Sequence, residues 1–325
     1  MTDAADEHLL LLPDGRTVAY STAGDPSSKD VVIFFHGAFG IGSAPTTLAP
    51  VFIERKLFFV APTLPGWGNT SPTPSGTPFH EQLYNDTTAV IQRLHPDIDD
   101  LRLYISGGSF GTVAAQIIYG APYEKFPLGR CIQGMLLLAP FTPFRVHKNY
   151  ASCLSWNSWL GVGPPSRIIP GNLIMRLAAS AMKSKTDTRE HAEAFMRDFM
   201  FKNMTEAERK LCEKWKVDKG IKDGEETRHL AEGLYRSVHK SWEGFKAIPD
   251  IFHSDWGGYS PAELDDEHSK PVLLFLTNGD RETKKMGEWL AGKLKNARVR
   301  YGEGGHIGSM FVMDDIWADF MSQFP

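Results

Sequence analysis

A serine stands between two glycines in the segment 107–111, which reads Gly-Gly-Ser-Phe-Gly. The apolar run before it predicts a short buried strand, and helix-forming residues follow it. G-x-S-x-G between a strand and a helix is the pattern that lifts a serine hydroxyl clear of a sharp turn. Gly107 and Gly111 leave space where a Cβ would clash, and the N–H groups of the following helix face Ser109. The pattern therefore predicts a nucleophile at Ser109, the alternative being a glycine-rich turn with an idle serine.

A serine hydroxyl is a weak nucleophile near neutral pH, and it needs a base that an acid orients. Histidine suits this role because its ordinary pKa lies near neutrality. Of the eleven histidines, His306 lies in a glycine-rich loop after the last predicted strand, from which it can reach back over the sheet. His147, at the start of a helical region, is a weaker candidate. We therefore expect His306 to be the base.

Asp280 is the carboxylate that directly follows a predicted strand, in the segment Asn278-Gly279-Asp280. A carboxylate at this position can accept the imidazole N–H, fix its tautomer and stabilise the imidazolium. Capping the helix that begins shortly afterwards is the alternative role for this side chain. Three other carboxylates follow no predicted strand: Asp255, Asp265 and Asp266. The sequence thus predicts a triad of Ser109, His306 and Asp280.

Short apolar runs predict the sheet that must position these side chains. Strands are expected at 9–12, 17–20, 31–35, 57–61, 101–105, 134–139, 272–276 and 297–301, and helices at 44–56, 79–94, 283–294 and 310–320. Strands that alternate with helices predict an α/β fold, with a mostly parallel sheet that carries helices on both faces. Ligands bind such sheets at the carboxyl ends of the strands, where His36, Ser109 and Pro140 are expected.

The alternation stops between residues 141 and 260. A loop-rich stretch is followed by helical patterns at 172–183, 188–203 and 226–242, and by a helix that begins with a capping-box pattern at Thr205-Glu206-Ala207-Glu208. Helices inserted between two strands of one sheet predict a cap over the crevice. We therefore expect a core of residues 1–140 and 261–325, and a helical cap of residues 141–260.

The order serine, aspartate, histidine resembles that of the α/β-hydrolase superfamily. The segment 36–40, His-Gly-Ala-Phe-Gly, resembles its oxyanion loop, and 65–71 resembles its P-G-x-G-x-S loop with one extra residue. The resemblance covers nearly the whole chain and implies an eight-stranded, mostly parallel sheet with an inserted helical cap. The oxyanion loop is neither H-G-G-G nor H-G-x-P-G, so no subfamily is assigned. The serine nucleophile argues against the branches with aspartate at this position, the haloalkane dehalogenases and epoxide hydrolases.

The same resemblance implies an oxyanion hole made of two backbone N–H groups. These belong to Ala38 and Phe110, with Phe39 as the alternative to Ala38. Donors of this kind are typically worth about 3 kcal/mol each in the transition state. His36 is expected to hold its loop in place and not to act as a second base.

Composition excludes several other classes of protein. The chain has 325 residues and a formal net charge of -4, without a basic block, so no nucleic-acid partner is expected. No apolar run reaches the roughly 18 residues of a membrane span, and the acidic residues 1–7 do not resemble a secretory signal. Three widely spaced cysteines predict a reducing compartment, the cytoplasm. No phosphate loop, dinucleotide fingerprint or metal-ligand spacing occurs, since His253 and Asp255 lack further ligands, so we expect no cofactor and no metal.

The sequence therefore predicts a serine hydrolase that cleaves a carboxylic ester, thioester or lactone. Two alternatives stay open: the same triad could serve C–C bond hydrolysis, lyase or cyclisation chemistry in a biosynthetic pathway, or the chain could be a ligand receptor with negligible turnover. The aromatic side chains of the cap indicate a small-molecule substrate with an apolar acyl or alcohol group, although the same side chains could simply pack the cap. Neither the substrate nor the oligomeric state is indicated by the sequence.

Overall fold

The computed structural model of the protein describes residues 7–202 and 204–325. Residues 1–6, on which the expectation about a secretory signal depends, and the last residue of the helix expected at 188–203 lie outside this range. The described residues form an eight-stranded sheet in the order β1-β2-β4-β3-β5-β6-β7-β8. The strands are β1 (His8–Leu11), β2 (Thr17–Gly24), β3 (Asp30–Phe35), β4 (Phe58–Pro62), β5 (Arg102–Gly108), β6 (Ile132–Leu138), β7 (Val272–Thr277) and β8 (Ala297–Gly302).

The sheet is mostly parallel, as the sequence predicts. Strand β2 runs antiparallel to β1 and β4, and the remaining neighbours pair in parallel. Its two faces carry separate apolar layers, because alternate side chains of a strand point to opposite faces. Val31, Ile33 and Phe35 of β3 belong to one layer and Val32 to the other. Strands buried on both sides explain the continuous apolar runs.

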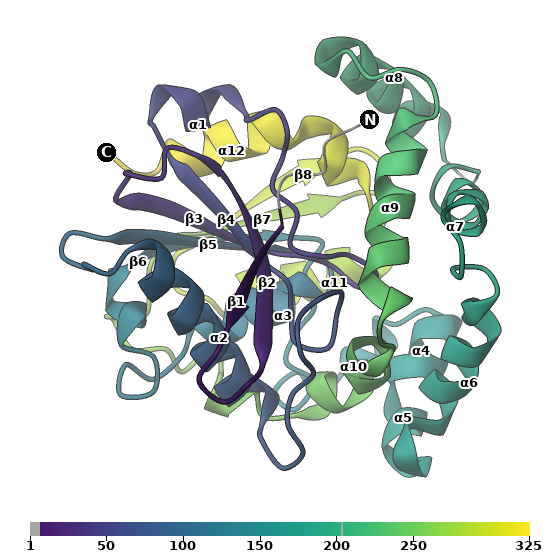
Figure 1. Ribbon diagram of the computed structural model, residues 1–325, viewed down its shortest axis with the longest axis horizontal. Coiled ribbons are helices and arrows are strands. Elements are labelled where there is room, and N and C mark those ends of the chain that lie inside the picture. The colour runs from purple at the N-terminus through teal and green to yellow at the C-terminus, as the bar shows by residue number, and fades with distance from the viewer. Residues whose placement is uncertain (1–6, 203) are drawn as a thin grey trace.

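Helices cover both faces of this sheet (Figure 1). On one face lie α1 (Pro50–Glu54) and α12 (Met313–Met321), whose side chains join the layer of Val32. On the other face lie α2 (Phe79–Leu94), α3 (Gly111–Tyr119) and α11 (Arg281–Ala291). The helices thus bury the apolar side chains that the strands present in both directions.

The chain between β6 and β7 is helical throughout its regular elements in the described residues. It forms α4 (Trp156–Val162), α5 (Pro164–Ile168), α6 (Leu173–Lys183), α7 (Arg189–Met196), α8 (Glu206–Lys219), α9 (Glu225–His239) and α10 (Glu243–His253). Figure 1 shows α4 to α9 gathered along one side of the sheet. Helix α8 begins with the capping box that the sequence predicts, because the side chains of Thr205 and Glu208 each accept the other's backbone N–H. None of the described helices combines the length and the apolar character that crossing a membrane requires.

Several element boundaries differ from the sequence prediction. The helix expected at 44–56 is reduced to α1, because Pro50 occupies its first turn and the residues before it form a loop. The helix expected at 226–242 ends at His239, and α10 follows as a separate helix that the sequence did not predict. Helices α4 and α5 also lie where only loops were expected. The predicted strands and the remaining predicted helices are present, with ends shifted by a few residues.

Candidate active site

Ser109 lies in the turn between β5 and α3 with a left-handed backbone conformation, φ 52°. A side chain other than glycine adopts this conformation at a cost, so surrounding contacts must hold it there. The Ser109 N–H donates to the carbonyl of Leu138 at 2.8 Å, and the Thr112 hydroxyl donates to the Ser109 carbonyl at 2.6 Å. The turn is tight enough to exclude any Cβ at Gly107 or Gly111: it would lie 2.4 Å from the Gly111 oxygen or 2.0 Å from the Phe35 oxygen. The glycines of the motif therefore answer a steric demand.

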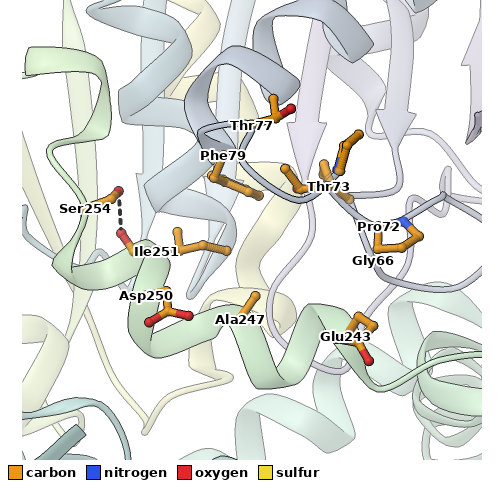
Figure 2. A pocket seen from close by; sticks show the side chains of 12 residues that line it. Gly66, Pro72, Thr73, Thr77, Phe79, Glu243, Ala247, Asp250, Ile251 and Ser254 are labelled. Atoms are coloured by element: carbon orange, nitrogen blue, oxygen red, sulfur yellow. Dashed lines mark hydrogen bonds between the residues drawn. The ribbon is translucent and has the colours of Figure 1, made fainter. Parts of the chain in front are cut away.

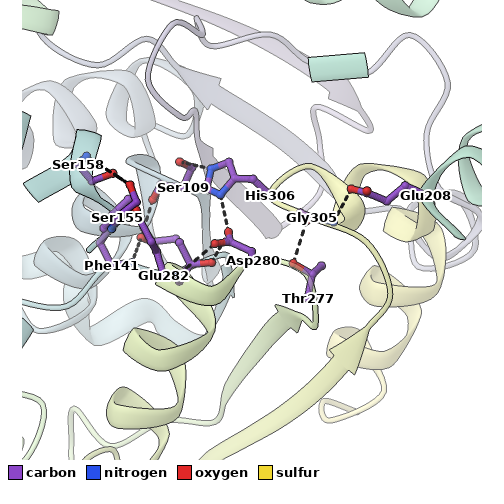
Figure 3. Close-up of polar contacts among 12 residues, drawn as sticks. Ser109, Phe141, Ser155, Ser158, Glu208, Thr277, Asp280, Glu282, Gly305 and His306 are labelled. Atoms are coloured by element: carbon purple, nitrogen blue, oxygen red, sulfur yellow. Dashed lines mark hydrogen bonds and ion pairs between the residues drawn. The ribbon is translucent and has the colours of Figure 1, made fainter. Parts of the chain in front are cut away.

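His306 lies in the loop after β8, where its ring touches both other members of the predicted triad (Figure 3). The Ser109 hydroxyl donates to Nε2 across 2.8 Å, and Nδ1–H donates to Asp280 Oδ2 across 2.6 Å. The structure thus brings together three residues that lie far apart along the chain. The His306 side chain is 46% exposed and that of Asp280 is 9% exposed, so solvent reaches the imidazole while the carboxylate is covered.

Asp280 has two roles in the structure, since it is also the N-cap of α11. Its Oδ1 accepts the N–H of Thr283 at 3.3 Å, and its Oδ2 accepts the Thr283 hydroxyl at 2.5 Å. Burial alone would raise the pKa of Asp280, but the hydrogen bond and charge of His306, helped by Thr283, outweigh it and lower this pKa below its ordinary value. Asp280 is therefore a carboxylate at neutral pH, as an acceptor of the imidazole N–H must be.

The loops that carry the acid and the base are joined to each other. They leave the sheet side by side because β7 and β8 are paired neighbours. The N–H of Gly279 donates to the carbonyl of Gly304 at 2.8 Å, and the Thr277 hydroxyl donates to the carbonyl of Gly305 at 2.8 Å. These bonds fix the position of the His306 loop relative to the strand end that supplies Asp280.

His36 holds the loop after β3 against the site. Its Nε2 accepts the N–H of Leu64 at 2.9 Å, so the proton is on Nδ1, which donates to the carbonyl of Gly37 at 2.8 Å. Burial lowers the pKa of His36 to about 4, and the ring is neutral at pH 7. These contacts agree with the expectation that His36 has a structural role. A Cβ at Gly37 would lie 3.3 Å from the Ser109 Cβ, which places this loop directly beside the serine.

The loop after β3 and the residue that follows Ser109 supply the candidate backbone donors for an oxyanion. Within residues 7–202 and 204–325, the N–H groups of Ala38, Phe39 and Phe110 donate to no protein acceptor. Phe110 precedes the first residue of α3, so the N-terminal end of that helix faces the same space. Phe39 has a positive φ of 62°, which turns its peptide relative to that of Ala38. The contacts leave both Ala38 and Phe39 available as the second donor.

The other candidates from the sequence lie elsewhere. His147 Nδ1 is 3.0 Å from the Thr142 hydroxyl, and its ring stacks on Trp289. The three alternative carboxylates have separate partners: Asp255 accepts the N–H of Gly257, Asp265 pairs with His268, and Asp266 pairs with Lys295. The His253 ring N–H donates to the carbonyl of Val162.

A pocket of about 300 Å³ lies between the loop after β4 and helix α10 (Figure 2). None of the three triad residues lines it. Its two carboxylates already have partners, since Glu243 pairs with Lys246 at 2.5 Å and Asp250 accepts the Asn172 amide at 2.6 Å. The pocket is thus distinct from the candidate active site.

Two contacts between the inserted helices and the triad loops were not predicted (Figure 3). Glu282, two residues after Asp280, accepts the N–H of Ser155 at the start of α4. Glu208 of α8 accepts the N–H of Gly305, the residue before His306. The only signal for either residue in the sequence was the capping box of Glu208, which indicates a helix start and not a tertiary contact.

The arrangement is suited to nucleophilic acyl transfer. The imidazole can take the proton from the Ser109 hydroxyl, the Asp280 carboxylate can stabilise the resulting imidazolium, and the nearby N–H groups can bind an oxyanion.

Comparison with known proteins identifies the fold. No protein-family model matches the chain, and no curated protein sequence matches it. Solved structures match over nearly the full length of both chains. They include MGS-M2, an α/β hydrolase enzyme from a deep-sea metagenome library (12% identity, TM-score 0.58, 97% and 96% covered), the esterase EaEST from Exiguobacterium antarcticum (13%, 0.57, 98% and 99%) and the thioesterase domain of the curacin biosynthetic pathway (17%, 0.56, 99% and 100%).

Proposed function

We propose that this chain, which has the α/β-hydrolase fold, is a serine hydrolase that cleaves a carboxylic ester, thioester or lactone with an apolar acyl group. The observation that carries the proposal is the unbroken hydrogen-bond path from the Ser109 hydroxyl through His306 to Asp280. The esterase and thioesterase among the similar structures support the reaction class, although fold alone does not determine the reaction.

In the acylation step, Ser109 Oγ attacks the acyl carbonyl while His306 Nε2 takes its proton. The carbonyl oxygen becomes an oxyanion and accepts the N–H of Phe110 and that of Ala38, with Phe39 as the alternative donor. His306 then gives its proton to the leaving alcohol or thiol, and an acyl-enzyme remains. Asp280 stabilises the imidazolium during both proton transfers.

In the deacylation step, His306 takes a proton from a water molecule that attacks the acyl-enzyme. The second tetrahedral intermediate uses the same N–H donors, and its collapse releases the acid and restores the Ser109 hydroxyl. The 46% exposure of the His306 side chain supports this step, because solvent reaches the imidazole ring.

We further propose that residues 141–260 are a cap on a core of residues 1–140 and 261–325, and that the cap binds the apolar acyl group. The contacts from Ser155 and Glu208 support this, since they place the inserted helices beside both triad loops. The cysteines Cys131, Cys153 and Cys212 are all free, which fits the proposed cytoplasmic location.

The test is labelling with a fluorophosphonate, followed by kinetics on a panel of p-nitrophenyl esters of increasing acyl length. The purified protein should be labelled and should hydrolyse at least one ester. Ser109→Ala should lose the label and lower kcat by about 10⁴-fold or more. The matched control is Ser322→Ala, which removes an exposed hydroxyl near the end of the sequence. This variant should keep both the fluorophosphonate label and the wild-type kcat.

Ester hydrolysis that is unchanged in Ser109→Ala would overturn the proposal. A protein that labels at Ser109 but turns over no ester in the panel would instead favour the alternatives in which the same triad performs other chemistry or retains a ligand.

A further inference from the structure

The segment 142–186, which contains α4, α5 and α6, has an unusual charge pattern. It holds six basic residues and no acidic residue, although the whole chain has a net charge of -4: Arg145, Lys148, Arg167, Arg176, Lys183 and Lys185. All six are exposed, and within the described part of the chain none of them forms an ion pair with a carboxylate. The segment is therefore cationic, and the two carboxylates that neighbouring elements turn toward it, Asp250 and Glu282, bond to Asn172 and Ser155 and to none of the six.

The same segment exposes large apolar side chains. Trp156 and Leu160 on α4 are 72% and 41% exposed, Ile168 on α5 is 81% exposed, and Leu173 and Leu177 on α6 are 50% and 62% exposed. Each helical pair is spaced by four residues, so its members share one face of their helix. Exposed apolar side chains in such a cluster indicate an interaction surface.

These exposed faces point away from the rest of the protein. Helix α10 packs against α4, α5 and α6. On α6 the buried side chains Met175 and Ala179 lie two residues from Leu173 and Leu177, which is about 200° around a helix. The apolar side chains of α6 thus lie opposite the face that packs inward, and Figure 1 shows the three helices as a lobe at the edge of the molecule.

We propose that this surface of α4, α5 and α6 docks onto a lipid bilayer that contains anionic lipids. Apolar side chains, tryptophan among them, enter the interface between headgroups and acyl chains, while lysine and arginine bind the negative surface. A nucleic acid would satisfy the charges but would leave the aliphatic side chains of α5 and α6 without a use, and the test below separates a soluble acidic partner from a bilayer. The surface begins beside the triad, because Ser155 at the start of α4 is bonded to Glu282.

The test is co-sedimentation of the full chain with phosphatidylcholine vesicles that contain or lack phosphatidylserine. The chain should bind the anionic vesicles, and high salt should weaken this binding. The double variant Arg176→Gln with Lys183→Gln should bind about thirtyfold more weakly. Each basic residue near an anionic surface contributes about a factor of five to the affinity, and two are removed. Trp156→Ala with Leu177→Ser should weaken it by a similar factor.

Matched controls come from exposed residues outside the segment. Leu11→Ser and Val217→Ser remove apolar side chains that are 72% and 78% exposed on β1 and α8. Lys210→Gln with Lys214→Gln removes two exposed charges that are paired on α8. None of these should reduce binding.

The proposal is overturned if the chain does not bind vesicles, or if it binds vesicles without phosphatidylserine equally well. It is also overturned if the control variants lose as much binding, or if the chain binds soluble acidic polymers in place of vesicles. Because the readout is binding, failure here leaves the proposed hydrolase activity untouched.

A second, independent observation concerns Glu208, the capping-box residue of α8. Its side chain is buried, at 6% exposure. One carboxylate oxygen accepts the N–H of Thr205 at 2.8 Å, and the other accepts the N–H of Gly305. The carbonyl of Gly305 accepts the Thr277 hydroxyl at 2.8 Å, so the residue before His306 is held from the inserted helices on one side and from the sheet on the other.

Glu208 also explains the glycines that precede His306. A Cβ on Gly304 would lie 3.0 Å from the Glu208 Cγ, and a Cβ on Gly305 would lie 2.8 Å from its Oε1. Around this contact, Cys212 of α8 packs with Phe311 in a small apolar cluster that Ile307 joins. The loop of the base is therefore shaped around a carboxylate that belongs to α8.

We infer that Glu208 is a positioning residue for His306, an inference that rests on the proposed function. Glu208→Ala should lower kcat about tenfold or more and slow fluorophosphonate labelling, with KM nearly unchanged, because the imidazole loses its fixed distance to Ser109. Glu208→Gln keeps one oxygen acceptor and should recover part of the loss. Glu206→Ala, an exposed acid in the same helical turn, is the matched control and should leave kcat unchanged.

Failure of the proposed function can be told apart from failure of the inference about Glu208. If the wild-type protein hydrolyses no ester, the proposed function fails before Glu208 is tested. If Ser109→Ala is inactive but Glu208→Ala keeps the wild-type kcat and only lowers the melting temperature, Glu208 has a structural role and the positioning inference is wrong. Glu208→Gln that recovers stability but none of the lost kcat would also contradict the inference, because the retained oxygen acceptor should restore part of the position of His306.

Discussion

At the scale of single residues, Asp280 combines two tasks that can be separated by one substitution. It caps α11 through Thr283 and accepts the Nδ1 proton of His306. Asparagine is about as good a helix cap as aspartate, so Asp280→Asn should preserve the fold. It should nevertheless lower kcat/KM by about 10⁴-fold, because a neutral amide can no longer stabilise the imidazolium and can favour the wrong tautomer. Ester kinetics and a thermal melt on the same sample measure both effects.

The control for this substitution is Asp265→Asn, which removes another carboxylate that pairs with a histidine, His268, far from Ser109. It should leave kcat/KM unchanged. Activity of Asp280→Asn within a factor of ten of the wild type would show that Asp280 serves only as a helix cap.

His36 makes the stability of the fold depend on pH. The folded protein protonates this ring only near pH 4, because of its burial, whereas the unfolded chain does so near pH 6.5. Between these values the unfolded state binds more protons, so stability falls as the pH falls, by about 3 kcal/mol over the whole interval. His36→Gln has no such group and should show a shallower loss of stability between pH 6.5 and pH 4.

Urea unfolding at several pH values measures this difference. His95→Gln is a useful comparison, because its ring is also buried and its pKa is also lowered, but it lies far from the loop beside Ser109. Parallel stability curves for the wild type and His36→Gln would contradict the prediction.

At the scale of elements, the turn between β5 and α3 depends on glycine at particular positions only. A Cβ on Gly111 would meet the backbone oxygen of Phe35 at 2.0 Å, whereas a Cβ on Gly108 would lie 3.6 Å from the nearest atom, the Phe34 Cζ. Gly111→Ala should therefore destabilise the protein by about 3 kcal/mol or more, while Gly108→Ala should change stability by less than about 1 kcal/mol. Urea unfolding of both variants checks this, and equal stabilities would contradict it.

The sequence predicted the elements whose signals are local. The continuous apolar strands, the glycine-flanked serine and the capping box of α8 each reflect contacts within a few residues, and each occurs in the structure. Helix α10 was missed because it contains Pro249, which normally ends a helix, and its apolar side chains pack against elements far along the chain. The contacts of Glu208 and Glu282 were missed because they join segments that the sequence cannot place together.

More of the candidate site than of the surrounding helices could be predicted from the sequence. Ser109, Asp280 and His306 each follow a strand, and parallel strands bring their carboxyl ends to one edge, so a parallel sheet was enough to expect these residues at the same edge. The oxyanion donors are backbone groups with no side-chain signal, which is why Ala38 and Phe39 could not be separated from the sequence.

At the scale of the whole molecule, shortening a side chain should cost much more stability in the two apolar layers than on the exposed surface. Trp317 on α12 is 5% exposed and packs edge-on against Phe52 of α1 at 5.2 Å between ring centres. Trp317→Ala should destabilise the protein by about 3–5 kcal/mol, because it leaves a cavity under the sheet. Trp156→Ala should change stability by no more than about 0.5 kcal/mol, since that side chain is 72% exposed. Chemical unfolding of the two variants makes the comparison, and a similar loss in both would contradict it.

The half-exposed imidazole of His306 bears on how long a covalent adduct at Ser109 would persist. Solvent reaches that ring in the structure, so water is at hand as an acyl acceptor and any other acceptor must compete with it. A reaction that must keep water away from such an adduct, such as macrocycle formation, would need the bound substrate itself to cover the imidazole.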